Sequence, residues 1–310
     1  MPDVLTIGEA MVSLRSSRAL RLGGDVHLSV AGSESNVAIG LARLGHKVAW
    51  LGAVGNDEPG HLIQRTLRAE NVDTRYLRFT DDSFTGFIAF DQPAHDITRV
   101  SYHRRGSAGS TLTPAECVTA LTASTPRILH VTGITPALST TAREATLAAV
   151  QTASKAGIQV SLDVNYRARL WPRPEAATAL RALLPYVTTI FASDDELDIL
   201  TDAPNPTAAL LSTATEVVVT AGSKGAWTHT ASGTTHHPAL PVTVVDSIGA
   251  GDAFVSGYLS ATLDNLPTEA RLTRATTSGA FCVGAHGDWE SLPTRQDLTL
   301  LTHTHGTALR

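Results

Sequence analysis

The chain has 310 residues, 43% of them hydrophobic and 17% charged, which fits one large domain over residues 1–310 or a core with a small appendage. Its formal net charge of −5 at pH 7 argues against a nucleic-acid partner or an anionic membrane surface. Apolar runs are shorter than about 18 residues, so no membrane span is expected, and the N-terminus lacks a basic leader. The only two cysteines are Cys117 and Cys282. Together these features predict a cytoplasmic protein with buried, reduced thiols.

Strand patterns and helical patterns alternate along most of the chain. Strands are predicted at Val4–Ile7, Val48–Val54, Ile128–Val131, Gln159–Asp163, Thr189–Ala192 and Glu216–Thr220. Helices are predicted at Asn36–Leu44, His61–Glu70, Thr141–Ala156, Pro174–Leu184 and Asp194–Leu200. This alternation predicts the α/β class, with a parallel sheet between two layers of helices.

Two segments depart from that pattern. Residues about 9–30 and about 83–104 lack helical periodicity and favour short strands, with 84–90 and 100–104 flanking a polar turn at 91–98. We expect them to form a small sheet that projects from the core. Such a sheet covers an active site or pairs with a second subunit, and the apolar pattern at Phe84, Phe87, Ile88 and Phe90 predicts a homodimer or higher homo-oligomer.

The stretch from 240 to 254 carries the strongest chemical signal. An apolar run at Leu240–Val245, expected to be a strand, is followed by Gly249, Ala250, Gly251, Asp252 and a helical pattern. Glycines and free N–H groups at a helix start bind anions, and a carboxylate beside them is placed to take a proton. The pattern thus favours phosphoryl transfer to a hydroxyl. The alternative is an ordinary first-turn aspartate favoured by the helix dipole.

Two other anion-binding motifs are excluded. The chain contains no G-x-x-x-x-G-K-[ST] sequence, and Phe254 stands where a dinucleotide-binding loop has its third glycine. Near the N-terminus, Gly32, Ser33 and Asn36 open a predicted helix. They are either an N-cap cluster alone or donors and acceptors for a polyhydroxylated ligand.

Three segments together resemble one family, the ribokinase-like (PfkB) sugar kinases. Residues 32–45 resemble its N-terminal signature, residues 219–226 its nucleotide loop, and residues 246–252 its C-terminal signature D-[TS]-x-G-A-G-D. They occur in the family's order, and the likeness covers essentially the whole chain. The resemblance implies a ribokinase-like parallel sheet sandwiched by helices, a β-sheet lid, and ATP and Mg²⁺ as cofactors.

The resemblance also implies roles for individual residues. Gly249, Ala250 and Gly251 would form the anion hole and Asp252 would be the base. The nucleotide would be bordered by Thr220, Gly222, Ser223, Lys224 and Gly225, with Asn165, Arg167 and Ser193 contributing. Lys224 is alternatively a solvated loop lysine. Glu196 matches the glutamate of the family's N-x-x-E motif and would help to place Mg²⁺, directly or through water, although Ser193 replaces the asparagine. Ser193 and Glu196 equally fit a capping box.

Two further runs resemble 2-keto-3-deoxygluconate kinases within that family. They are Tyr102-x-Arg104 and Asp163-x-Asn165-Tyr166-Arg167. Arginine binds carboxylates bidentately, so Arg104 and Arg167 would recognise a sugar acid together with Tyr102. The alternatives are a surface arginine on an edge strand for Arg104 and a structural pair with Asp163 for Arg167. His103 and Ile88 depart from the tyrosines usual in that group.

The closing segment adds Asp288, which would accept a hydrogen bond from a substrate hydroxyl or is a turn aspartate. His303 and His305 have a metal-like spacing but are expected to be non-functional.

The sequence predicts a kinase of the terminal hydroxyl of 2-keto-3-deoxygluconate. A PfkB-family kinase of fructose, ribose or another sugar acid, and a non-catalytic sugar-binding regulator, stay open as alternatives.

Overall fold

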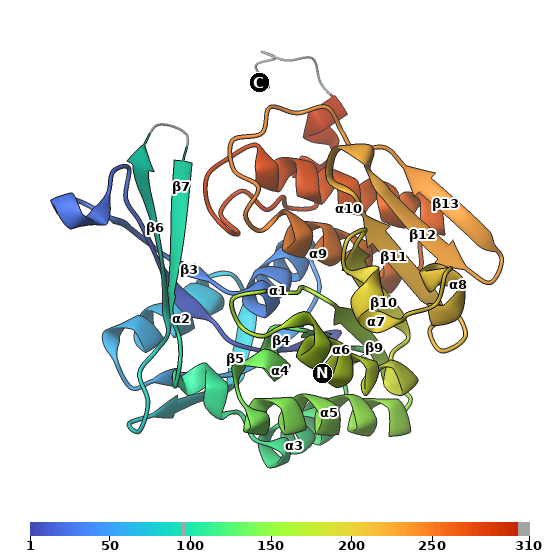
Figure 1. Cartoon of the computed structure of the whole chain (residues 1–310), viewed down its shortest axis with the longest axis horizontal. Helices are drawn as coiled ribbons and strands as arrows, with labels where there is room; N and C mark the ends of the chain where they lie inside the picture. The colour runs from blue at the N-terminus through green and yellow to red at the C-terminus, as the bar shows by residue number, and fades with distance from the viewer. Residues whose placement is uncertain (95–96, 303–310) are drawn as a thin grey trace.

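The computed structural model describes residues 1–94 and 97–302, and its centre is a sheet of nine strands (Figure 1). These strands are β1 (Val4–Ile7), β4 (Val48–Gly55), β5 (Val72–Thr80), β8 (Ile128–Thr132), β9 (Gln159–Asp163), β10 (Thr189–Ser193), β11 (Glu216–Thr220), β12 (Ala226–Thr230) and β13 (Gly233–His237). Their order is β13-β12-β11-β10-β9-β8-β1-β4-β5. The pairs from β5 to β11 are parallel, whereas β12 and β13 add in antiparallel fashion. The six strands predicted from the alternating strand and helix pattern all lie in this sheet.

Helices cover both faces of the sheet. One layer contains α1 (Ser33–Arg43), α2 (Glu58–Ala69), α9 (Ala250–Leu263) and α10 (Thr268–Val283). The other contains α3 (Pro114–Ser124), α5 (Thr140–Lys155), α6 (Arg173–Arg181), α7 (Leu197–Leu200) and α8 (Pro206–Leu210), with the short α4 (Thr135–Leu138) beside α5. No helix in the described residues is long and apolar enough to cross a membrane.

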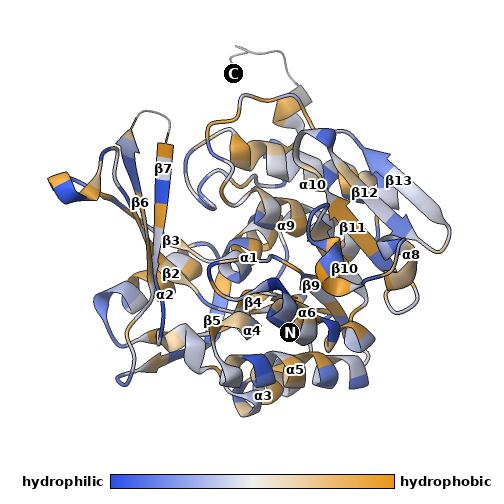
Figure 2. Ribbon diagram, in the orientation of Figure 1, coloured by the Kyte–Doolittle hydropathy of each residue, from blue (hydrophilic) through white to orange (hydrophobic). Residues whose placement is uncertain are grey.

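Successive side chains of a strand point to opposite faces of the sheet, so they pack in the two different hydrophobic cores on those faces. In β1, Leu5 and Ile7 pack with α3 and α5, whereas Val4 packs with α1 and α9. Because both faces of a covered parallel sheet are buried, the inner strands β1, β4 and β8 are buried at every residue. Figure 2 shows the inner strand β11 as hydrophobic and the outer strand β13 as hydrophilic.

The second sheet has four strands in the order β3-β2-β6-β7 and projects beside the core (Figure 1). They are β2 (Met11–Arg15), β3 (His27–Ala31), β6 (Phe87–Ala94) and β7 (Ile97–His103). We call this sheet the lid. Its buried residues Met11, Ala31, Ile88 and Phe90 form a small hydrophobic cluster. The predicted ribokinase-like architecture with a β lid is therefore confirmed.

Three predicted details are wrong. Residues 240–245 form no strand, because Pro241 cannot donate to a ladder and Val244 is 65% exposed, outside the sheet. Strand β6 begins at Phe87 rather than 84, since the Thr85 N–H and hydroxyl bond to Asp57 instead of to a strand. The predicted turn at 91–98 is mostly strand, with 95–96 outside the described residues.

The predicted helices are confirmed with shifted ends. The helix expected at 174–184 ends at Arg181 and is followed by a 3-10 turn at Leu184–Tyr186, because the residue before Pro185 disfavours helical geometry. The helix expected at 194–200 begins only at Leu197.

Candidate active site

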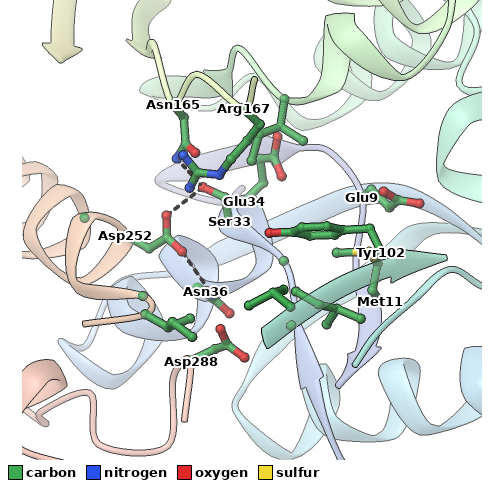
Figure 3. A pocket seen from close by; sticks show the side chains of 18 of the residues that line it. Glu9, Met11, Ser33, Glu34, Asn36, Tyr102, Asn165, Arg167, Asp252 and Asp288 are labelled. Carbon is green, nitrogen blue, oxygen red and sulfur yellow. Dashed lines mark hydrogen bonds between the residues drawn. The ribbon is translucent and has the colours of Figure 1, made fainter. Parts of the chain in front are cut away.

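A pocket of about 360 Å³ lies where the lid meets the carboxyl ends of β1, β8 and β9 and the first turns of α1 and α9. Parallel sheets bind ligands at this edge. The structure brings most of the predicted site residues together here: Gly32, Ser33, Asn36, Tyr102, Arg104, Asn165, Arg167, Gly249, Gly251, Asp252 and Asp288. Figure 3 shows Asp252 on one wall, with Tyr102 and Glu9 across from it.

Asp252 lies in the first turn of α9 and is only 7% exposed. Its carboxylate accepts hydrogen bonds from the Ser33 hydroxyl at 2.6 Å and the Asn36 amide at 2.8 Å (Figure 3). Burial raises the pKa of Asp252, and these two hydrogen bonds oppose that rise. The result is a held carboxylate facing the pocket, which is the geometry of a general base.

The turn before Asp252 presents the start of α9 to the pocket. Gly249 is the N-cap in a left-handed conformation with φ 77°, and no side chain caps the helix there. A Cβ on Gly249 would lie 2.2 Å from the Asp288 carbonyl oxygen, so only glycine fits. Ala250 begins the helix beside Gly251. The first N–H groups of a helix lack intrahelical partners and attract phosphate.

A second polar group, Asn165 and Asp163, is connected to Asp252 through the Ser33 hydroxyl. The Asn165 amide donates to the Ser33 hydroxyl and to Asp163, each at 3.0 Å. Burial, with Glu196 and Asp252 nearby, raises the pKa of Asp163 to about 8. Arg167 is exposed, donates to the Tyr166 carbonyl at 3.1 Å and points toward Ser33 and Asp252 in Figure 3. A hydrogen-bonded structural pair of Arg167 with Asp163 is therefore not found.

Arg104 is buried at the far end of the pocket, 7% exposed. Its Nε donates to Glu9 at 2.6 Å, its Nη2 also pairs with Glu9, and the Ser107 hydroxyl bonds the same carboxylate. The alternative of a surface arginine on an edge strand is wrong, since Arg104 is buried and follows the last residue of the edge strand β7, His103. No hydrogen bond of Arg104 Nη1 is found among the described residues, so this nitrogen stays available to a ligand.

The two departures from the sugar-acid kinase pattern have different surroundings. Ile88 lines the pocket together with Met11 and Phe90, so this part of the wall is apolar. His103 stacks on Phe87 at 4.3 Å between ring centroids and does not line the pocket.

Asp288 is 5% exposed and lines the pocket. Burial raises its pKa to about 7, with the charge of Arg15 opposing. Arg15 extends from β2 of the lid, donates to Asp246 at 2.8 Å and lies 3.9 Å from Asp288. The lid is thus tied by an ion pair to the segment that precedes the Gly249–Gly251 turn.

The predicted nucleotide residues other than Asn165 and Arg167 do not line this pocket and lie at or just after the ends of β10 and β11. Thr220 ends β11, and Gly222–Lys224 form a 3-10 turn before Gly225. Ser223 lies within that turn. The Lys224 side chain is 74% exposed, and its ammonium lies 3.8 Å from Asp194.

Glu196 accepts hydrogen bonds from the backbone N–H groups of Tyr166 at 2.7 Å and Ser193 at 2.9 Å. The Ser193 hydroxyl bonds Asp195 rather than the helix, and α7 starts at Leu197. A complete capping box is therefore absent from this turn. A carboxylate has about four acceptor positions, so Glu196 retains capacity for a metal-bound water. His303 and His305 lie outside the described residues.

The sequence analysis missed two charged residues of the pocket, Glu9 and Glu34. Glu9 follows Gly8 at the carboxyl end of β1, which is the edge where ligands bind, so its position was a usable signal. Glu34 stands between Ser33 and Asn36, but nothing in the residue pattern distinguishes it from a first-turn glutamate favoured by the helix dipole.

A buried carboxylate beside a free helix N-terminus, under a lid, is the arrangement of a phosphotransferase acting on a small hydroxylated molecule. The profile of the pfkB family carbohydrate kinases matches residues 1–295. The chain is 34% identical to 2-dehydro-3-deoxygluconokinase of Bacillus subtilis (strain 168), covering 96% of this chain and 94% of that protein. It is 32% identical to fructokinase of Klebsiella pneumoniae, covering 95% and 97%.

Among solved structures, a putative ribokinase II from E. coli in complex with ATP and Mg²⁺ superposes with a TM-score of 0.89 at 23% identity, covering 97% of this chain and 99% of that one. The chain belongs to the pfkB family of carbohydrate kinases. It is an ATP-dependent sugar kinase, and the alternative of a non-catalytic regulator is not supported.

Proposed function

We propose that the protein phosphorylates the terminal hydroxyl of 2-keto-3-deoxygluconate. The observation that carries this proposal is the buried Arg104 in the pocket, with Nη1 available. Arg167, whose guanidinium lies near Ser33 and Asp252 in Figure 3, adds a second guanidinium to the pocket. A guanidinium recognises a carboxylate bidentately, and a neutral sugar has no such group. The similarity to the Bacillus subtilis protein supports the same substrate class.

In this mechanism the sugar acid lies with its carboxylate near Arg104 and its terminal hydroxyl at Asp252. Asp252 accepts the hydroxyl proton as the oxygen forms a bond to the γ-phosphorus of ATP, the bond from that phosphorus to the β–γ bridging oxygen breaks, and ADP leaves. The N–H groups at Gly249–Gly251 stabilise charge on the transferred phosphoryl group. Ser33 and Asn36 fix the carboxylate orientation through their hydrogen bonds, and Asp288 accepts a substrate hydroxyl.

The nucleotide would lie along Thr220–Gly225, with Lys224 reaching its phosphates and Asn165, Arg167 and Ser193 contributing. Mg²⁺ offsets charge on the transferred group in phosphoryl transfer and is held mostly by phosphates with few protein ligands. The Asn165 Oδ1 atom is buried without a partner among the described residues, and Glu196 has spare acceptor capacity, so these two residues fit a hydrated Mg²⁺.

A second candidate is a kinase of fructose, ribose or another sugar acid, which the similarity to the Klebsiella pneumoniae fructokinase favours. A substrate panel decides between them. Release of ADP is measured with 2-keto-3-deoxygluconate, other sugar acids, fructose and ribose, with and without excess EDTA. We expect the highest kcat/KM with 2-keto-3-deoxygluconate and no turnover in EDTA. A preference for a neutral sugar refutes the substrate assignment, and full activity in EDTA refutes the Mg²⁺ requirement.

A further inference from the structure

The segment at 238–249, which the structure describes in full, joins β13 to α9 without helix or strand. Its backbone is held at one point near its end, where the N–H groups of Val245 and Asp246 donate to the Val283 carbonyl of α10. Because no ladder of backbone hydrogen bonds fixes the residues that follow, side-chain contacts decide where the N–H groups of the Gly249–Gly251 turn point.

Asp246 connects this segment to the lid with one carboxylate oxygen on each side. Its Oδ1 accepts the Ile248 N–H at 3.1 Å within the segment, and its Oδ2 accepts a hydrogen bond from Arg15 Nη1 at 2.8 Å. Arg15 is the last residue of β2 in the lid. The two charged side chains are 17% and 12% exposed, so salt and water screen this ion pair much less than an exposed one.

The lid holds the Arg15 guanidinium in place from its own side. Phe90 lies opposite Arg15 in the register of β2 with β6, and the centroid of its ring is 4.1 Å from Arg15 Cζ, which is a cation–π distance. Ile248 packs against the hydrophobic cluster that contains Phe90. The lid therefore contacts the segment through two side chains, Asp246 and Ile248, which both come just before the turn.

We propose that Arg15 is a positioning residue, which acts through Asp246 to hold the Gly249–Gly251 turn where its N–H groups stabilise the transferred phosphoryl group. This inference rests on the role proposed above for that turn. Arg15 is not among the described residues that line the substrate pocket, so it acts through Asp246 and not on the sugar. Because Arg15 belongs to the lid, the turn is held only while the lid lies over the pocket.

The test substitutes the two partners singly and together. Arg15→Gln removes the charge, Arg15→Lys keeps it, and Asp246→Asn keeps an oxygen for the Ile248 N–H. The matched control is Arg99→Gln, which also takes a lid arginine from a buried carboxylate, that of Asp91, but within the lid. The readouts are kcat, KM for sugar and for ATP, and the thermal midpoint. All are measured with the sugar that gives the wild type its highest kcat/KM, so the test does not depend on the substrate assignment.

We expect Arg15→Gln to lower kcat by about tenfold or more, while the KM for ATP changes less than about threefold. Removing one donor to a developing charge costs about 10²–10³-fold in kcat, and displacing donors costs part of that. Arg15→Lys should keep about a third or more of the wild-type kcat. The double variant Arg15→Gln with Asp246→Asn should lose no more than its more affected single variant, because both residues act through one contact. Arg99→Gln should leave kcat within about threefold of the wild type.

Three results would overturn the positioning role. Losses that multiply in the double variant would mean that the two residues act independently. Equal loss of kcat in Arg99→Gln would mean that any loosening of the lid is enough, and equal loss in Arg15→Lys would mean that the charge is not what matters. Gly249→Ala deforms the turn directly. If it lowers kcat and Arg15→Gln does not, only the role of Arg15 fails, and if neither lowers kcat, the role proposed for the turn fails with it.

Discussion

Asp252 is buried, accepts hydrogen bonds from two side chains and lies at the N-terminus of a helix. Asp252→Asn removes the basic carboxylate while it keeps the volume and the bond from Ser33. We expect kcat to fall by about 10²–10⁴-fold, the usual cost of losing a general base, with little change in the KM for sugar. Release of ADP gives kcat, and thermal unfolding shows whether the variant is folded. A kcat within threefold of the wild type would show that Asp252 is not the base.

Substitution of Arg104 tests whether the pocket recognises a sugar acid or a neutral sugar. Truncating one partner of a buried charge pair costs roughly 2–5 kcal/mol, so Arg104→Met should lower kcat/KM for 2-keto-3-deoxygluconate by about 30-fold or more. Activity on fructose or ribose should fall far less, because those sugars present no carboxylate.

The control for Arg104 follows from its partner in the structure. Arg104→Met alone leaves the Glu9 carboxylate buried without its cation, which destabilises the chain for reasons unrelated to substrate. Arg104→Met combined with Glu9→Gln removes that charge. If the double variant loses activity equally on acid and neutral sugars, Arg104 supports the lid and does not recognise the carboxylate.

Asp288 should make the free energy of unfolding depend on pH. Its pKa is raised by burial to about 7, so the folded chain binds this proton more tightly than the unfolded chain. The stability it contributes is present at low pH and is lost as pH rises through about 7. Asp288→Asn cannot ionise, so it should gain stability relative to the wild type as pH rises from about 5 to about 7, by at most ~1.4 kcal/mol per pH unit, and the gain should level off above that.

Urea unfolding of the ligand-free protein at several pH values measures this difference. Asp297→Asn is a suitable control, because hydrogen bonds from Thr294 lower the pKa of Asp297, and it is ionised in both states over this range. A wild-type-minus-variant difference that stays flat for Asp288→Asn would mean that its carboxyl remains ionised in the folded chain.

At the scale of elements, the parallel strands and the Gly249–Asp252 turn were predictable from the sequence, whereas the course of residues 240–245 was not. Strands such as Val48–Val54 are short apolar runs between nearby glycines, here Gly45 and Gly55, so pattern alone located them. Residues 240–245 have the same apolar character but follow a course set by contacts with α10, where Val245 and Asp246 donate to the Val283 carbonyl. Local pattern carries no information about that neighbour.

The candidate site was predictable where motif residues carry the chemistry. Gly249, Asp252 and Asn36 belong to recognisable runs, and their convergence follows from the α/β fold. The partners Glu9 for Arg104 and Thr132 for Glu34 are about 95 or more residues away in sequence. Only the packed structure brings them together, so a single sequence shows neither the ion pair nor the buried acid.

The turn before α9 tests the link between backbone geometry and activity. Gly249→Ala puts a Cβ at a left-handed residue and against the Asp288 carbonyl. We expect a loss of about 1–3 kcal/mol in unfolding free energy, with a lower kcat. Gly251→Ala is the matched control for stability, because nothing lies within 4 Å of its Cβ and alanine suits a helix. Equal urea midpoints for Gly249→Ala and the wild type would contradict the strain argument.

At the scale of the whole molecule, the lid leaves apolar side chains uncovered. Ile88 and Phe90, on which the expectation of a dimer partly rested, are 5% and 3% exposed and pack inside the chain. Exposed apolar residues are found instead on the two edge strands, Leu28 at 54% on β3 and Ile97 at 57% on β7. Edge strands with exposed apolar groups pair readily with another chain.

We therefore propose that two copies associate through their lids, which would add walls to the pocket mouth. Light scattering at micromolar concentration should give twice the mass of the chain. Leu28→Asp with Ile97→Asp should shift the protein toward monomer, because burying an unpaired carboxylate in an interface is costly. Val118→Asp is the control, since Val118 on α3 is also exposed, at 36%, but lies away from the lid. A wild-type monomer at that concentration would show that the chain does not dimerise. A dimer that Val118→Asp breaks and the lid variant does not would place the interface outside the lid.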